Sequence, residues 1–285
     1  MPRRATTLGA LAAVLLAFAA LYWGVARQLV SEWGGENFSH GFLIVPIALY
    51  FVWERRHALA AEEPRPSIVG LFVVIASAAL QVLGVLASAL FVSRLSILGM
   101  LAGIVLFLFG LRHLKILAFP IAFLVLMIPI PTIVFNKIAF PLQLLASQLG
   151  ELGLNIVGVP VLREGNVITL SNISLEVADA CSGIRSLVSL LTLAIVYGYL
   201  LERRTWARVA IAAASVPVAI AANGFRVAAT GVAAYYIGPE VAQGVLHEFS
   251  GWLVFVVAFI LLAAVQRGIS WLFPAPSPPE KQGAV

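Results

Sequence analysis

Eight long apolar stretches occupy most of this chain, and they constrain its fold more than any other feature of the sequence. They cover about residues 7–26, 42–53, 67–91, 95–111, 116–135, 184–201, 206–226 and 251–265. Most of them reach the roughly 17–25 residues that a helix needs to cross a bilayer. Because 61% of the 285 residues are hydrophobic and only 11% are charged, lipid must be the solvent for most of the chain. The sequence predicts an all-α polytopic membrane protein with about eight transmembrane helices.

The distribution of basic residues predicts the orientation of these helices. Eight spans place both termini on one side, and a cytoplasmic N-terminus puts only Arg27, Arg94, Lys137 and Arg163 outside. Arg185 and Arg226 then lie within or at the ends of spans, and twelve of the 18 Lys and Arg residues lie inside: Arg3, Arg4, Arg55, Arg56, Arg65, Arg112, Lys115, Arg203, Arg204, Arg208, Arg267 and Lys281. This bias follows the positive-inside rule. We therefore expect cytoplasmic N- and C-termini, and we attribute the net charge of +5 to topology rather than to nucleic-acid binding.

Two stretches do not have the pattern of a membrane span. Over residues 140–159, apolar residues recur at steps of three and four with Gln and Glu between them, which predicts an amphipathic helix on the outer face. Over residues 161–177, apolar and polar residues alternate after a turn at Glu164-Gly165-Asn166, which predicts a small β element on the same face. We expect residues 1–273 to form a single membrane domain, followed by a Pro-rich, disordered cytoplasmic tail over 274–285.

Three chemically reactive residue types are expected at the same depth of the membrane. Cys181, the only cysteine, precedes the sixth apolar stretch, which runs from outside to inside. Arg226 ends the seventh, because twenty residues at 1.5 Å each carry a helix about 30 Å, roughly one hydrocarbon thickness. His247 precedes the eighth, which again starts outside. The topology thus predicts a thiol, a guanidinium and an imidazole on the outer face.

Each of these groups suits acyl transfer at a peptide carbonyl. The positive end of a helix dipole lowers the pKa of a cysteine at a helix N-terminus, and Ser182 and Gly183 suit such a start. A histidine can take the thiol proton and later protonate the leaving amine. An arginine stays protonated and can stabilise an oxyanion.

Less specific explanations exist for each residue. A lone membrane cysteine is usually a packing residue, and an arginine near a helix end can extend its side chain to lipid phosphates. His40 competes with His247, because it also lies outside, just before the second apolar stretch. Glu176 could orient a histidine, but a solvated strand edge explains that carboxylate equally well. The convergence of three residue types favours a site over three unrelated residues.

Short blocks around these residues resemble the exosortase/archaeosortase family. The three main blocks are Ala-Cys-Ser-Gly-Ile-Arg at 180–185, Asn-Gly-Phe-Arg at 223–226 and His-Glu-Phe-Ser-Gly at 247–251. Phe-Ser-His-Gly at 38–41 and Arg-Glu-Gly-Asn-Val-Ile at 163–168 also look like bacterial exosortases. The resemblance covers about residues 20–265, and the blocks follow the order and spacing of the family. Ile184 stands where leucine is commoner, a conservative departure.

The resemblance implies a transpeptidase-like cysteine protease of the bacterial inner membrane, with its active site on the periplasmic face. Its partners would be membrane lipid and exported proteins that end in a Pro-Glu-Pro-type (PEP-CTERM) sorting signal, a membrane helix and a basic tail. By this resemblance Cys181 is the acyl-thioester nucleophile, Arg226 the proton donor or oxyanion partner, and His247 a support for the transition state. The supporting or substrate-binding candidates are Ser182, Gly183, Arg185, Asn223, His40 and Glu176.

A different class of function remains open from the sequence. A transporter or lipid-handling protein could bind an anionic head group through Arg226 and Arg185, which would make Cys181 incidental. The absence of inverted repeats or interrupted midplane helices gives that alternative no support. No HExxH motif is present, so we expect no metal and no other cofactor. Replacement of Cys181 by alanine separates the two classes, because only the protease depends on the thiol.

Overall fold

The computed structural model describes residues 2–35, 38–171, 173–177, 183–238 and 245–273. The chain divides into two compact units, Met1–Thr132 and Ile133–Val285, which are described in turn. Helices form most of both units, and the second also contains a three-stranded sheet. The predicted tail over residues 274–285 lies outside the described residues.

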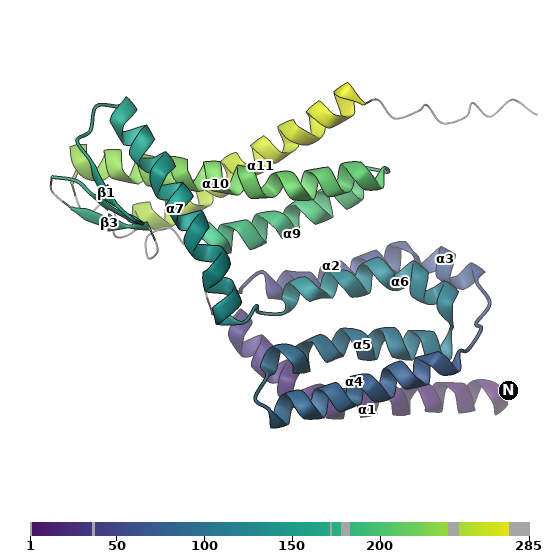
Figure 1. Ribbon diagram of the computed structural model, residues 1–285. Coiled ribbons are helices and arrows are strands. Elements are labelled where there is room, and N and C mark those ends of the chain that lie inside the picture. The colour runs from purple at the N-terminus through teal and green to yellow at the C-terminus, as the bar shows by residue number, and fades with distance from the viewer. Residues whose placement is uncertain (1, 36–37, 172, 178–182, 239–244, 274–285) are drawn as a thin grey trace, which may run out of the picture. The chain divides into compact units, whose positions relative to one another are not determined.

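Six α-helices and one 3-10 helix build the first unit (Figure 1). They are α1 (Pro2–Trp33), α2 (Gly41–Glu54), α3 (Arg56–Ala61), α4 (Ile68–Leu86), α5 (Leu90–Leu108), α6 (Leu111–Phe123) and η1 (Leu124–Met127). Helices α4 and α5 form a hairpin in which glycines allow the backbones to approach closely. A Cβ atom at Gly84 would lie 2.5 Å from the Ser93 hydroxyl, and one at Gly103 would lie 2.9 Å from the Val74 backbone nitrogen. Small residues at such contacts are typical of helix pairs in membranes.

Several polar side chains inside the first unit have hydrogen-bond or ion-pair partners within it. The Tyr22 hydroxyl of α1 lies 3.0 Å from the Ser96 hydroxyl of α5, which in turn donates to Gln81 of α4 over 3.3 Å. Arg94 is 3% exposed and forms a bidentate ion pair with Glu32 near the end of α1. Because a buried charge is costly unless it is paired, this contact explains how an arginine expected in an outer loop is accommodated within α5.

The described residues contain fewer clear membrane spans than the eight expected. Five helical segments are long and apolar enough to cross a bilayer: Ala13–Trp33, Ile68–Leu86, Leu90–Leu108, Thr205–Tyr236 and Gly251–Leu272. Counting the interrupted pair Leu111–Met127 and Thr132–Ile156 as one span gives six. The second expected span corresponds to α2, which has only 14 residues, and the apolar part of α9 is also shorter than a full span. The structure therefore shows a multi-pass protein with five or six candidate spans, and it does not confirm the count of eight.

The expected span over residues 116–135 is not one continuous helix. Helix α6 and η1 end at Met127, and a new helix, α7 (Thr132–Ile156), begins after Ile128-Pro129-Ile130-Pro131. A proline lacks the backbone N–H that a helix needs and also disfavours helical geometry in the residue before it, so two prolines in four residues break the helix. The amphipathic helix therefore begins eight residues earlier than the expected 140 and ends at Ile156 rather than at 159.

Three long helices and a small sheet join α7 in the second unit. The helices are α9 (Gly183–Leu201), α10 (Thr205–Tyr236) and α11 (Val245–Leu272), and Figure 1 shows them packed together. Leu190, Ile211 and Leu262 are among the residues of one apolar cluster, which these three helices share. A second apolar cluster contains Leu154 of α7 and Ala234 of α10, together with residues of the sheet. Helix α10 contributes to both clusters.

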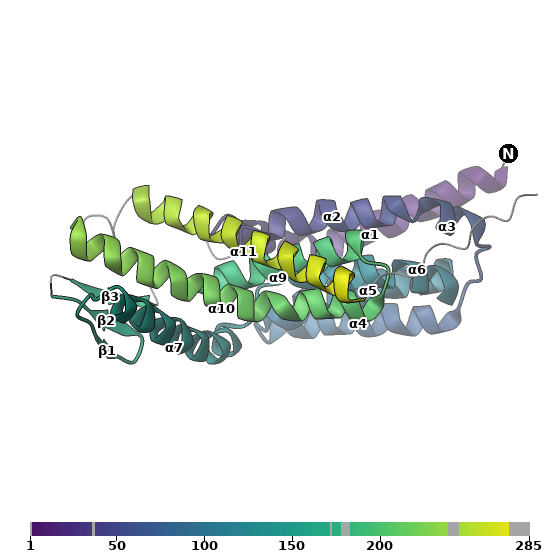
Figure 2. The same ribbon diagram turned by 90° about the horizontal axis from the view of Figure 1, so that it is seen from above.

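The predicted β element at 161–177 is present as a three-stranded antiparallel sheet in the order β1 (Leu162–Glu164), β2 (Val167–Thr169) and β3 (Ser174–Glu176). Gly165 has a φ of 65° at the first position of the two-residue β1–β2 turn, a conformation that favours glycine. The turn is fixed to α7, because the Ser147 hydroxyl donates to the Gly165 carbonyl over 3.0 Å. Figure 2 shows the sheet beside α7.

Glycines allow α7 and α10 to pack closely. A Cβ atom at Gly150 of α7 would lie 3.0 Å from the Cβ of Val227, and one at Gly224 of α10 would lie 2.5 Å from the Cβ of Leu149. A Cβ atom at Gly153 would lie 2.7 Å from that of Ala228. The two helices cannot pack this closely if larger residues replace the glycines.

Replacement of Gly150 by alanine is expected to destabilise the second unit, because the new methyl group overlaps Val227. Overpacking of this kind costs about 1–3 kcal/mol. Gly268→Ala is the matched control, since nothing lies within 4 Å of a Cβ at this other helical glycine. Thermal unfolding of the detergent-solubilised protein should show a lower midpoint for Gly150→Ala than for Gly268→Ala. Equal midpoints would contradict the close packing of α7 on α10.

Candidate functional site

The structure describes some of the candidate side chains and not others. Cys181 and Ser182 lie outside the described residues. The backbone places Gly183 and Arg185 at the start of α9 and His247 near the start of α11, and the structure describes no side-chain positions for Arg185 and His247. The candidate side chains that the structure describes are Arg226, Asn223, His40 and Glu176. Their contacts are described within each unit separately: His40 belongs to the first unit, and Arg226, Asn223 and Glu176 belong to the second.

The guanidinium of Arg226 lies against the first part of α11. A Cβ atom at Gly251 would lie 3.6 Å from Nη2 of Arg226, 3.7 Å from its Cζ and 3.8 Å from its Nη1. All three distances correspond to ordinary van der Waals contact, so the guanidinium lies next to this turn of α11, and a methyl group at position 251 would touch it without overlap. His247 precedes Gly251 by four residues in the same helix, which places the two positions on one helix face, one turn apart. Helices α10 and α11 therefore bring the arginine to the turn of α11 that follows His247.

Arg226 also lies at the boundary between the two apolar clusters of the second unit. Ala222 belongs to the cluster of α9, α10 and α11, and Val227 belongs to the cluster with α7 and the sheet. The expected seventh span, 206–226, is too short, because α10 continues ten residues beyond Arg226 to Tyr236. The reason is that residues after Arg226 pack against α7, as Val227 does against Gly150. The charged residue sits where one apolar environment gives way to another.

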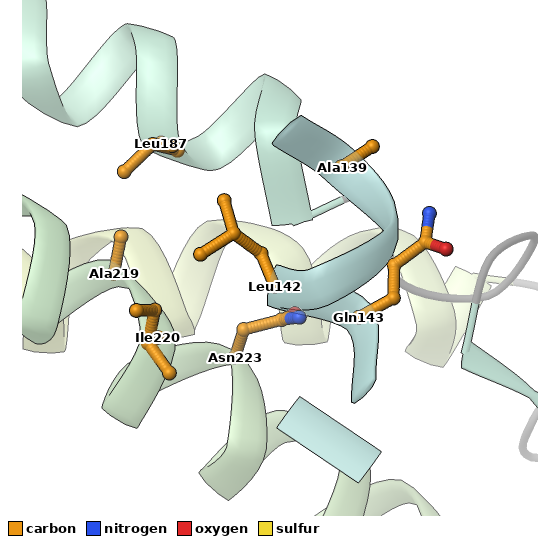
Figure 3. Close-up of a pocket in the computed structure, with 7 residues that line it drawn as sticks. All are labelled: Ala139, Leu142, Gln143, Leu187, Ala219, Ile220 and Asn223. Carbon is orange, nitrogen blue, oxygen red and sulfur yellow. The ribbon is translucent and has the colours of Figure 1, made fainter. Parts of the chain in front are cut away.

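Asn223 lines two adjoining pockets one helical turn before Arg226. The first pocket is small and is lined by residues of α7, α9 and α10: Ala139, Leu142, Gln143, Leu187, Ala219, Ile220 and Asn223. In Figure 3 the Asn223 amide points toward the segment of α7 that contains Leu142. The second pocket is equally small, shares Ala219 and Asn223 with the first, and is completed by residues of α11. Asn223 is 5% exposed, so its buried amide lies among mostly apolar side chains, one helical turn before Arg226.

The sequence identified Arg226 and Asn223 as candidates, but it assigned no role to two residues that the structure places beside them. Gly251 appeared only as the last residue of a sequence block, although the Arg226 guanidinium lies next to it. Gln143 was assigned only to the polar face of the amphipathic helix, and it lines the first pocket. A glycine near the start of a long apolar helix is the signal that could have pointed to the first of these.

His40 belongs to the first unit, where it lies immediately before α2. Its imidazole donates a hydrogen bond to the backbone carbonyl of Leu126 in η1, and its ring lies 6.3 Å from that of Phe38. The neighbouring Trp33 donates to the carbonyl of Met127 over 2.9 Å, so two rings are fixed to η1. Burial lowers the pKa of His40 below its usual value, and the bond to Leu126 opposes this shift only in part. Nδ1 is buried and has no hydrogen-bond partner within the described part of the chain.

The position of Glu176 is simpler. It is the last residue of β3, its side chain is exposed, and it pairs in register with Val167 of β2. The sequence left two interpretations of Glu176 open, a role in orienting a histidine and a solvated strand edge. An exposed carboxylate at a strand end is what the second interpretation describes. Among the residues that the structure describes, no group of three or more His, Cys, Asp and Glu side chains has a geometry that could hold a metal ion.

The lowered pKa of His40 predicts a dependence of stability on pH. The folded protein favours the neutral imidazole, so His40 contributes stability that is fully present above the usual histidine pKa of about 6.5 and is lost as the pH falls below it. Thermal unfolding between pH 8 and pH 5 should show a midpoint that falls by a few degrees more in the wild type than in His40→Gln. Parallel pH profiles for the two proteins would show that burial of His40 has no such effect.

Comparison with known proteins identifies the family. A family model described as transmembrane exosortase (Exosortase_EpsH) matches residues 32–264, which include the blocks around Cys181, Arg226 and His247. Searches of curated proteins and of solved structures give no match. Since the family match covers most of the chain, and the described helices and sheet lie largely within it, this multi-pass membrane protein belongs to the transmembrane exosortase family.

Proposed function

We propose that this chain is a cysteine protease or transpeptidase that cleaves the C-terminal sorting signals, of PEP-CTERM type, of exported proteins through an acyl-thioester on Cys181. Membership of the exosortase family makes a membrane enzyme of protein sorting the general class, with exported proteins that carry sorting signals as substrates. The observation that most directly supports the specific chemistry is the proximity of the Arg226 guanidinium to position 251, where a Cβ atom would lie 3.6 Å from Nη2, one turn after His247.

Helix geometry supports the grouping of three chain segments at one end of the second unit. From Thr205 to Arg226 is 21 residue steps along α10, or about 32 Å at 1.5 Å per residue, close to one hydrocarbon thickness. Gly183 begins α9 at the end of the chain segment that contains Cys181, and α11 begins at Val245, two residues before His247. Because α9, α10 and α11 pack together, an arginine one membrane thickness along α10 is compatible with a thiol and an imidazole at the starts of the other two helices.

The proposed reaction assigns one task to each group. The Cys181 thiolate attacks the scissile carbonyl carbon, and the developing oxyanion is stabilised by the Arg226 guanidinium. His247 takes the thiol proton and delivers it to the leaving nitrogen as the C–N bond breaks, which leaves a thioester on Cys181. Attack by water or by an acceptor amine then releases the acyl group and returns a proton to the thiolate. We prefer histidine for proton transfer because the guanidinium pKa lies far above working pH. A pH–rate profile without an ionisation near neutrality would contradict this assignment.

The charge pattern supports an outer location for the reaction. The excess of Lys and Arg in the segments assigned to the inside favours cytoplasmic termini. This orientation directs the α9 and α11 starts toward the periplasmic face of a bacterial inner membrane. An exported protein retained by its own C-terminal membrane helix would reach that face with its sorting signal at the interface. We further propose that membrane lipid surrounds residues 1–273 as one catalytic domain.

The proposal is tested by co-expression with an exported protein that carries a PEP-CTERM-type sorting signal. Cys181→Ala should abolish processing, since no other cysteine exists in the chain. Arg226→Ala and His247→Ala should each reduce processing by at least about 100-fold, because the loss of one oxyanion partner or one general base costs about that much. Immunoblots that separate the uncut from the cut substrate provide the measurement.

Folding controls decide how a loss of processing is interpreted. Each variant should reach wild-type levels in the membrane fraction and unfold at a similar temperature. His40→Ala belongs in the same series, because it tests the competing histidine. A Cys181→Ala protein that still cut the substrate would refute the protease and favour a transporter or lipid-handling protein with an anion on Arg226 and Arg185.

The contact between Arg226 and Gly251 leads to a second prediction. Gly251→Ala adds a methyl group at ordinary contact distance, whereas Gly251→Leu needs the space that the guanidinium occupies. Processing should therefore fall in a graded way, with a loss of about tenfold or more for leucine and a much smaller loss for alanine. Gly268→Leu is the matched control, because it changes another glycine of α11 with open space around it. Equal effects of Gly251→Leu and Gly268→Leu would show that the contact does not position Arg226.

A further inference from the structure

The strand β3 presents two residues of backbone toward the outer edge of the sheet. The Leu170 N–H donates to the Ile173 carbonyl over 2.8 Å, and the Val177 N–H donates to the Asn166 carbonyl over 3.0 Å. Backbone groups of alternate residues in a strand point to opposite sides, so residues 173, 175 and 177 direct theirs toward β2. Ser174 and Glu176 direct theirs away from the sheet.

These outward groups are available within the described part of the chain. No backbone hydrogen bond between described residues uses the N–H or the carbonyl of Ser174 or the N–H of Glu176 on that side, and helical geometry begins at the next residue, Val177. On the opposite edge, the Arg163 side chain of β1 is fixed to α7 by an ion pair with Glu151 at 2.5 Å. The β1 edge has only Arg163 between two residues that pair with β2, so the β3 edge offers more backbone groups to another strand.

The fold holds this edge firmly in place. Leu175 points into the apolar cluster with α7 and α10 and is buried, while Ser174 and Glu176 on either side are exposed. The Ser174 hydroxyl also lies 3.3 Å from the Thr169 hydroxyl of β2. A strand anchored by its central residue keeps the direction of its outward N–H and carbonyl groups, which is what pairing with an extended peptide requires.

The edge is also close to Cys181 along the chain. Five residue steps separate Glu176 from Cys181, so the chain between them can span at most about 18 Å. A peptide paired with β3 would therefore have its backbone within a few residues of the thiol. The same edge is too short to hold two copies of the chain together, because two residues offer at most four hydrogen bonds. A substrate that its own membrane helix already retains at the interface needs only such a short contact, because the second binding event is intramolecular.

We propose that the outer edge of β3 binds the extended segment of the exported substrate that precedes its membrane helix, by adding it to the sheet as a fourth strand. The inference rests on the proposed function, since it names the surface that orients the scissile bond toward Cys181. Binding through backbone groups accepts many side chains, so the contact sets the direction and register of the peptide more than its sequence. Specificity would then come from groups elsewhere in the site.

Proline at position 174 tests the backbone contact without breaking the sheet. Ser174→Pro removes an N–H that faces outward, whereas the N–H groups that bond β2 belong to the neighbouring residues. Ser174→Ala is the matched control, because it also loses the hydroxyl contact with Thr169 but keeps the N–H. Processing of the co-expressed substrate should be about fivefold to tenfold lower for Ser174→Pro than for Ser174→Ala, as expected for one lost hydrogen bond and a blocked edge. Both variants should unfold at similar temperatures.

Cross-linking provides a second readout that does not depend on turnover. In a Cys181→Ala background, Ser174→Cys is combined with single cysteines at successive positions of the substrate segment before its membrane helix. Disulfide formation should alternate with a period of two residues, because side chains of a paired strand alternate between faces. Equal processing by Ser174→Pro and Ser174→Ala, or cross-links without that period, would overturn the strand pairing. The loss of processing in Cys181→Ala would stand in either case, so the two proposals fail separately.

Discussion

The 32-residue helix α10 packs against two different groups of elements, and it thereby connects the two apolar clusters of the second unit. Its first part shares an apolar cluster with α9 and α11, and its last part shares another with α7 and the sheet. A helix in lipid satisfies its own backbone hydrogen bonds, so α10 can extend past the hydrocarbon without a cost for unpaired groups. The sheet, whose edge strands carry unpaired backbone groups, packs in the second cluster. Arg226 lies between the two, where a charge can contact polar surroundings while its helix remains packed.

Close helix packing makes this arrangement possible. Gly150 and Gly153 on α7 face Val227 and Ala228 on α10, and Gly224 on α10 faces Leu149. Without side chains at these positions the backbones approach, and the larger residues of the partner fill the space. The spacing at Gly251 is looser, because a Cβ atom there would lie 3.6 Å from the nearest atom of the Arg226 guanidinium. Small residues thus determine the close packing of α7 on α10.

The sequence predicted the helical class, the family and the β element, because each depends on a local pattern. Apolar stretches of membrane length predict helices whatever their neighbours are, and the Gly165 turn predicts a hairpin from two residues. The prediction from sequence was wrong where prolines interrupt an apolar stretch. Pro129 and Pro131 divide an apolar run that hydropathy alone treats as continuous, so α7 starts at Thr132. The end of α10 was also wrong, because residues after Arg226 are helical through contacts with α7 that no window of sequence contains.

The sequence proposes residue types for the candidate site but gives no contacts between them. It singled out Cys181, Arg226 and His247 because a thiol, a guanidinium and an imidazole are chemically distinctive and are expected at one depth of the membrane. The contact of Arg226 with Gly251 joins residues 25 positions apart on two helices, and only packing reveals it. The surroundings of His40 could not be predicted from the sequence either. Its hydrogen bond to the Leu126 carbonyl involves a 3-10 turn that the sequence treated as part of a membrane span, and its Nδ1 is buried.

The small size of the sheet has a physical consequence of its own. A long exposed strand edge pairs readily with other chains, and proteins usually avoid this by keeping edge strands short. Each strand here has three residues, and β3 offers only Ser174 and Glu176 outward. Such an edge is too weak to bind a free peptide, since a few net hydrogen bonds do not offset the entropy lost on association. A peptide that its own membrane helix already retains at the interface has lost most of that entropy beforehand. Under the proposed strand pairing, the short edge therefore favours membrane-tethered substrates over soluble ones.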